Sequence, residues 1–175
     1  MGRAAVSCFE KAVELLGRRA HFRRELEQKL LRRAYGPGEV KETLDRLQEL
    51  RYLDDERTAG AFVEARVERA PAGRPLLRSE LVKRGAARTV AEGALEAVDE
   101  SGAAKEAAER FLRRRQRPNE SEADRQKALL RHLASRGFPG HLVRKVMDQV
   151  QDELAEAIDA MDVVDLDDEV EGSLG

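Results

Sequence analysis

The chain has 175 residues, of which 41% are hydrophobic, 38% are charged and only 4% are aromatic. This mixture favours helices with wide charged faces over β-sheet, which needs more β-branched and aromatic residues. The single cysteine, Cys8, excludes an intrachain disulfide and a cysteine-based metal cluster, and the N-terminal segment has no secretory apolar stretch, so we expect a cytoplasmic, all-α protein.

The charge is distributed unevenly along the chain, although the net charge is only −2. Residues 156–175 contain eight acidic residues and no lysine or arginine. Residues 1–155 therefore hold all 32 basic residues and 26 of the 34 acidic ones, which gives them a net charge of +6. A basic helical body fits a polyanionic partner or an acidic protein surface, and solvated helix faces are the alternative.

The first fifty residues contain three amphipathic patterns separated by breaks. The first is predicted to end at Gly17, the second to run through Arg33, and the third to begin near Pro37 after the break at YGPG. Their apolar positions are Phe9, Val13 and Leu16; Phe22, Leu26 and Leu30; and Val40, Leu44 and Leu47. This spacing predicts a three-helix unit.

Two further units of the same kind follow. A turn at 52–55 opens the second, and either Asp54 or Asp55 can cap the helix that starts there. A third unit is predicted after Ser101-Gly102, with Ser121 as a helix cap. The apolar positions are Ala59, Phe62, Val63, Val67, Leu77, Leu81, Val90, Leu95 and Val98 in the second unit and Ala104, Ala107, Ala108, Phe111, Leu112, Leu129, Leu133, Leu142, Val146, Met147 and Val150 in the third.

Equivalent positions recur about every 51 residues. The aligned sets are Leu26, Leu77 and Leu129; Leu30, Leu81 and Leu133; and Ala34, Gly85 and Gly137, where the first unit departs from glycine. Such a period is typical of stacked repeats that share their apolar faces. We predict an elongated, curved array of three repeats, residues 1–53, 54–100 and 101–158, followed by an acidic, disordered tail at 159–175.

The sequence offers little catalytic or metal chemistry. His21, His132 and His141 are not spaced to share a helix face, and no second cysteine joins them. Asp54 and Asp55 lack a partner acid or a nucleophile, and capping explains them better. No phosphate-binding loop or strand-linked GxGxxG is present. We therefore predict no catalytic residues, no metal and no cofactor, and hence a protein that is not an enzyme.

Arginine-rich clusters are the more informative feature. They are Arg18, Arg19, Arg23 and Arg24; Arg66, Arg69, Arg74 and Arg78; Arg113, Arg114, Arg115 and Arg117; and Arg131, Arg136, Arg144 and Lys145. Arginine binds carboxylate or phosphate through two parallel hydrogen bonds, which suits an anionic partner. A GC-rich genome would also raise the arginine count, and cations at a predicted helix end, as at 113–117, also suit the helix dipole.

Two consecutive segments carry a family resemblance. LDDERTAGAFVEAR at 53–66 followed by GRPLLRSELVKRG at 73–85 resembles the second repeat of RecX, a bacterial family that regulates the RecA recombinase. The matching positions are Asp54, Asp55, Phe62, Arg66, Gly73, Arg78, Leu81 and Gly85, while Arg84 stands where lysine is commoner. Six of them we interpret as structural: Asp54, Asp55, Phe62, Gly73, Leu81 and Gly85. The resemblance extends over about residues 5–155.

The resemblance implies a regulator that binds in the groove of the RecA filament on single-stranded DNA. It implies damped ATPase, strand-exchange and co-protease activity, and a role in recombination, DNA repair and the SOS response. We predict a monomer whose partner-binding residues are Arg66, Arg74, Arg78, Lys83, Arg84, Arg113, Arg114, Arg115, Arg131, Arg136, Arg144 and Lys145. A protein that binds DNA directly and a passive helical scaffold are the alternatives.

Overall fold

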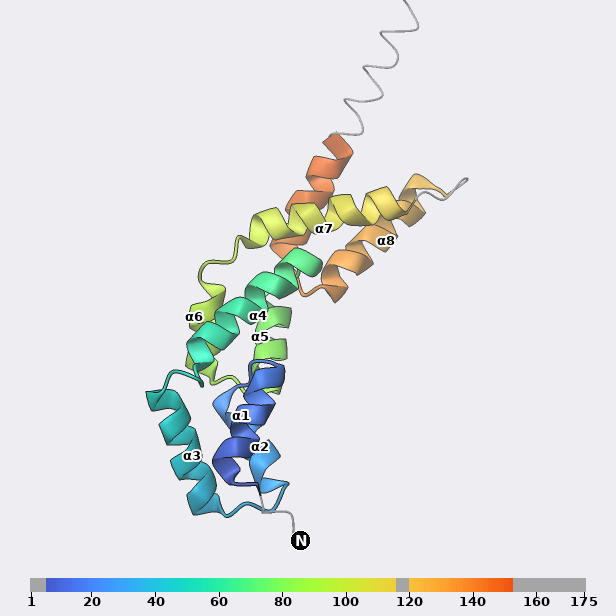
Figure 1. The fold of residues 1–175 in the computed structure, drawn as a ribbon. Coiled ribbons are helices and arrows are strands. Elements are labelled where there is room, and N and C mark those ends of the chain that lie inside the picture. Colours follow the sequence, from blue (N-terminus) through green and yellow to red (C-terminus); the bar gives the residue numbers. More distant parts are fainter. Residues whose placement is uncertain (1–5, 116–119, 153–175) are drawn as a thin grey trace, which may run out of the picture. The chain divides into compact units, whose positions relative to one another are not determined.

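The fold is described by a computed structural model over residues 6–115 and 120–152, and these residues form helices and connections without a strand (Figure 1). The chain divides into two compact units between Glu100 and Ser101. The described helices follow one another as three three-helix repeats, which confirms the predicted all-α repeat fold. None of them is long and apolar enough to cross a membrane.

The first repeat contains α1 (Cys8–Arg18), α2 (Arg23–Leu31) and α3 (Pro37–Glu49). Ser7 opens α1 with a reciprocal cap, in which its side chain accepts from the Glu10 backbone N–H and the Glu10 carboxylate accepts from the Ser7 backbone N–H. Pro37 occupies the first turn of α3, as predicted, because a residue there needs no hydrogen-bonding N–H.

The second repeat contains α4 (Asp55–Arg69), α5 (Arg74–Arg84) and α6 (Arg88–Leu95). Helix α6 packs against both α4 and α5. The third repeat contains α7 (Glu100–Arg114), α8 (Glu122–Ser135) and a helix over residues 140–152. Ser121 caps α8 as predicted, but Ser101-Gly102 lies inside α7 rather than before it, because the helix begins at Glu100.

Each repeat has its own apolar core, although one predicted stripe is wrong. In α1 the fully buried side chains are Cys8, Ala12 and Leu15, whereas Val13 is 40% exposed and Phe9 only packs at the edge. The small residues Cys8 and Ala12 allow the helix to approach its neighbours closely. The prediction followed the larger side chains on the adjacent stripe.

The first two repeats share apolar surface, as stacked repeats do. Phe22 precedes α2 in the first repeat, yet its side chain is 2% exposed and belongs to the core of the second repeat, with Leu77 and Leu81. Burying an aromatic side chain of this kind stabilises the fold by about 2–3 kcal/mol. The first two repeats are therefore joined through their cores.

The second helix of every repeat ends in the same left-handed turn. Ala34, Gly85 and Gly137 have φ angles of 66°, 103° and 75°, and each donates its N–H to the carbonyl three residues earlier. Glycine adopts such angles freely, whereas a Cβ costs roughly 1–2 kcal/mol there. Ala34 thus holds a position that favours glycine.

Within the first compact unit, Met1–Glu100, two acidic residues cap helix starts that come much earlier in the chain. The Asp55 carboxylate accepts from the backbone N–H of Arg23 at 2.7 Å, and the Glu100 carboxylate accepts from that of Arg74 at 2.7 Å. In both cases the carboxylate accepts from the first backbone N–H of a helix, α2 for Asp55 and α5 for Glu100. Asp54 caps α4, as predicted for one of the two acids, so Asp55 serves a different helix.

Candidate partner-binding surface

Several of the predicted partner-binding arginines instead connect helices inside the second repeat. Arg66 in α4 pairs with Glu80 in α5, with Nε 3.0 Å from Oε2, and its side chain is only 12% exposed. Arg78 in α5 makes two bonds, of 2.6 and 2.9 Å, to Glu92 in α6. These bonds hold the pKa of Glu92 below its usual value. Both arginines therefore have a structural partner already.

Arg74 and Arg115 are similarly engaged. Arg74 donates through Nη2 to the carbonyl of Val98 at 2.8 Å, which fastens the start of α5 to the end of the repeat. Arg115 folds back from the end of α7 onto Glu120 at 2.5 Å, and its guanidinium lies 5.4 Å from the Phe111 ring centre. The predicted 113–115 cluster thus presents Arg113 and Arg114 outward and keeps Arg115 close to the fold.

The other predicted cations are accessible. Lys83 and Arg84 are exposed at the end of α5 in one unit. In the other unit the predicted residues that are exposed are Arg113, Arg114, Arg131, Arg144 and Lys145, and Arg136 is half-exposed. Arg131 donates through Nε to the Lys127 carbonyl at 3.2 Å. The predicted residues that are exposed therefore present their charge at the surface of their unit.

The family-motif residues have structural positions. Asp54 and Asp55 cap helices, and Gly73 precedes α5 with an extended backbone. Leu81 is completely buried and Gly85 ends α5 in the left-handed conformation. The Phe62 ring lies under the Arg84 guanidinium at 4.6 Å, so it also positions an exposed cation.

A basic groove lies between α2 and α5, and the predicted site contains only two of its cations, Lys83 and Arg84. The groove measures about 540 Å³ and is lined mainly by polar side chains, together with Val82 and Gly85. Its charged residues are Arg19, Arg24, Glu25, Lys83 and Arg84. Sequence clustering had singled out Arg19 and Arg24, but no pattern in the sequence connects them with Lys83 and Arg84 sixty residues later.

His21 is buried in a polar network that includes Arg19 and Glu25 of this groove. Its Nδ1 lies 2.8 Å from the Arg19 carbonyl, to which it donates, so Nε2 accepts from the Lys29 ammonium at 2.7 Å. Burial lowers the pKa of His21, and the lysine contact fits the neutral ring. Burial raises the pKa of Glu25, but hydrogen bonds from Arg19 and Lys29 outweigh that effect and leave it below its usual value.

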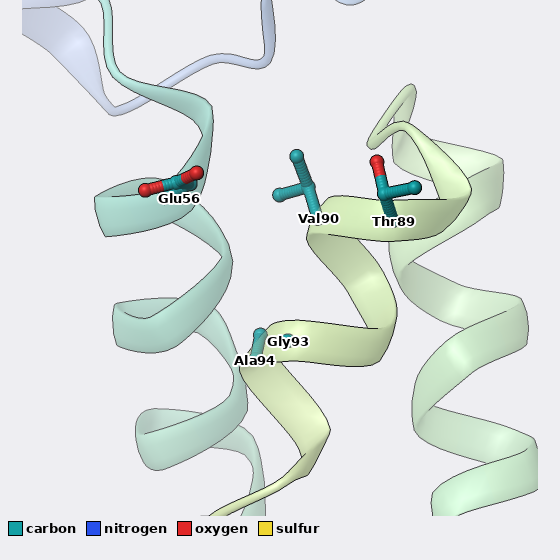
Figure 2. Close-up of a pocket in the computed structure, with 5 residues that line it drawn as sticks. All are labelled: Glu56, Thr89, Val90, Gly93 and Ala94. Atoms are coloured by element: carbon teal, nitrogen blue, oxygen red, sulfur yellow. The ribbon is translucent and has the colours of Figure 1, made fainter.

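A second hollow offers no catalytic constellation. It measures about 450 Å³ between α4 and α6 and is lined by Glu56, Thr89, Val90, Gly93 and Ala94 (Figure 2). A lone carboxylate beside a threonine lacks the base and electrophile that bond-breaking chemistry needs. Within residues 6–115 and 120–152, no group of three or more histidine, cysteine or acidic side chains could hold a metal ion.

Comparisons with known proteins agree with this architecture. Residues 8–47 match the family model for the first three-helix domain of RecX, and residues 99–147 match that for its third three-helix domain. The regulatory protein RecX of Chlorobium phaeobacteroides is 34% identical over 145 residues, covering 81% of this chain and 92% of the relative. That of Halorhodospira halophila is 39% identical over 145 residues, covering 82% and 88%.

The solved structures agree on the fold. The crystal structure of RecX from Lactobacillus salivarius superposes with a TM-score of 0.72 at 20% identity, covering 82% of this chain and 94% of that one. Fold and surface together define an all-α three-helix repeat protein that presents exposed cations. The sequence matches go further, and the chain belongs to the RecX family of regulatory proteins.

Proposed function

We propose that this protein binds in the groove of the RecA filament on single-stranded DNA and lowers the recombinase, ATPase and co-protease activities of RecA. Membership of the RecX family supports RecA as the partner. The observation that supports a binding surface is the set of exposed cations, above all Arg113 and Arg114 at the end of α7. Repeats can contact successive subunits of a filament, and each added contact acts at high effective concentration.

This function needs no chemistry from the chain itself. In our proposal the protein acts as a cytoplasmic monomer without a cofactor, and not as an enzyme. A binding protein of this kind uses charge to accelerate encounter and set orientation, so its affinity should fall as salt rises.

The test is inhibition of DNA-stimulated ATP hydrolysis by the RecA of the same genome. Arg113→Glu with Arg114→Glu should raise the concentration for half inhibition about tenfold or more, because two exposed charges are reversed. The matched control reverses two other exposed cations, Lys41→Glu with Lys127→Glu. Equal effects of the two double variants would show that only net charge matters, and no inhibition by the unchanged protein would refute the proposal.

A second candidate function is direct binding to DNA, which the basic groove between α2 and α5 favours. Binding of the protein to bare single-stranded DNA and to the RecA filament, measured at the same salt concentration, separates the two. Tighter binding to the filament supports RecA as the partner, and equal affinity supports DNA.

A further inference from the structure

The groove between the first two repeats brings together cations that are far apart in the chain. Arg19 and Arg24 lie on either side of the start of α2, and Lys83 and Arg84 form the last turn of α5. With Glu25 as its only acid, the lining carries a net charge of +3. All of these residues belong to the same compact unit, so the groove is a property of that unit alone.

Most of this positive charge is available to a ligand. Glu25 is already bonded to Arg19 at 3.1 Å and to Lys29 at 2.9 Å, so its negative charge is neutralised within the protein. Arg24 and Lys83 are exposed and form no ion pair with another described residue. Arg84 is exposed as well and is held over the Phe62 ring, which leaves its N–H groups free to bind outward.

Backbone contact fixes the two walls of the groove. Gly85 has a φ angle of 103°, and a Cβ at this position would lie 3.1 Å from the Glu25 backbone nitrogen and 3.4 Å from the Arg24 Cβ. The end of α5 therefore lies close against the start of α2, and a residue with a Cβ at position 85 would have to adopt a strained backbone and push the start of α2 away by a few tenths of an ångström.

The lining points to phosphate rather than to a protein surface. Cores of protein interfaces are depleted of charge and contain apolar or aromatic anchors, whereas this groove has Val82 as its one apolar side chain. It has no aromatic side chain in its lining for stacking on a base. Arginine and lysine alone suffice for contacts to a nucleic-acid backbone, which carry affinity but not sequence preference.

We propose that this groove binds the phosphodiester backbone of a nucleic-acid strand through Arg19, Arg24, Lys83 and Arg84. The inference deepens the second proposed function, direct DNA contact, on which it rests. It requires binding that is independent of base sequence and strongly dependent on salt. Its test contains no RecA, so its failure would leave the RecA proposal standing.

The test measures fluorescence anisotropy of a labelled 30-nucleotide oligo-dT with the full chain at 50, 100 and 200 mM KCl. Arg24→Gln with Lys83→Gln should weaken binding about tenfold at the lowest salt. It should also reduce the slope of log K against log salt by about 1.4, since each contact to a single strand contributes about 0.7. The charge-keeping variant Arg24→Lys with Lys83→Arg should stay within about twofold of the unchanged protein.

The matched control is Arg32→Gln with Lys41→Gln, which removes two exposed charges from the other end of α2 and from α3. It should leave the slope unchanged. The proposal is overturned if this control loses as much affinity as Arg24→Gln with Lys83→Gln does. It is overturned as well if the unchanged protein does not bind oligo-dT at 50 mM KCl. It is also overturned if polyglutamate at equal charge displaces the oligonucleotide as well as unlabelled oligo-dT does, because the groove would then be a site for acidic protein.

Discussion

Asp55→Ala should lower the free energy of unfolding by about 1–2 kcal/mol. The change removes the carboxylate that accepts from the Arg23 N–H at 2.7 Å, and loss of a helix cap costs about 0.5–2 kcal/mol. The Arg23 N–H is half-buried, so leaving it without a partner adds to that cost. Burial also raises the pKa of Asp55, which shows that holding the charge there is itself unfavourable and keeps the net loss modest.

Urea unfolding followed by circular dichroism measures this loss. Asp55→Asn keeps an oxygen acceptor and should lose less than the alanine variant, while the neighbouring exposed Glu56→Ala should change stability by less than about 0.5 kcal/mol. Equal losses for Asp55→Ala and Glu56→Ala would refute the cap between repeats.

The pH dependence of the same variants gives an independent check. Because the folded-state pKa of Asp55 is raised, the folded chain binds more protons than the unfolded chain between the ordinary aspartate pKa of 3.8 and the folded-state pKa. The contribution of Asp55 to stability therefore falls as pH rises through that window. Asp55→Ala and Asp55→Asn should both remove this part of the slope.

Two further predictions use the same unfolding assay. Ala34→Gly should stabilise the protein by about 0.5–1 kcal/mol, because residue 34 has a left-handed φ that glycine adopts without strain. Gly85→Ala should destabilise it by more than about 1 kcal/mol, because the added Cβ would also meet the Glu25 backbone. Changes of the same sign in the two variants would contradict the role of the left-handed turn. Burial lowers the pKa of His21 in the folded chain below its ordinary value of 6.5. Between these two pKa values the unfolded chain binds more protons than the folded chain, so the free energy of unfolding should fall as pH drops below 6.5. His21→Gln should flatten that slope, and an unchanged slope would show that His21 does not titrate as inferred.

Local patterns predict most of the helices. Apolar spacing, Pro37, Gly85 and Gly137 each act within one or two turns of the chain, so their structural effect can be derived from neighbouring residues. The same reasoning chose Val13 over Ala12 as a core residue. Periodicity identifies the apolar stripes of a helix, but it does not decide which of two adjacent stripes meets the neighbouring helix.

Local sequence patterns do not predict contacts between residues that are far apart in the chain. The Asp55 carboxylate reaches a backbone N–H 32 residues earlier, and no local signal distinguishes it from Asp54, which caps its own helix. The groove likewise depends on the packing of α2 against the end of α5. Repeat alignment identified the equivalent turns, yet it could not give the distance between Arg24 and Lys83.

The acidic residues facing each cluster decide which arginines are available for binding. Arg66 and Arg78 each meet a glutamate 14 residues later, on the next helix of the repeat, and these pairs hold the helices together. The groove has the same kind of basic residues, but its one glutamate is bonded to Arg19 and Lys29, which leaves Arg24 and Lys83 exposed. Clusters that look equivalent in the sequence therefore separate into structural cations and exposed ones. The placement of carboxylates distinguishes Arg66 and Arg78 from Arg24 and Lys83, and Arg74 is held by the Val98 carbonyl instead.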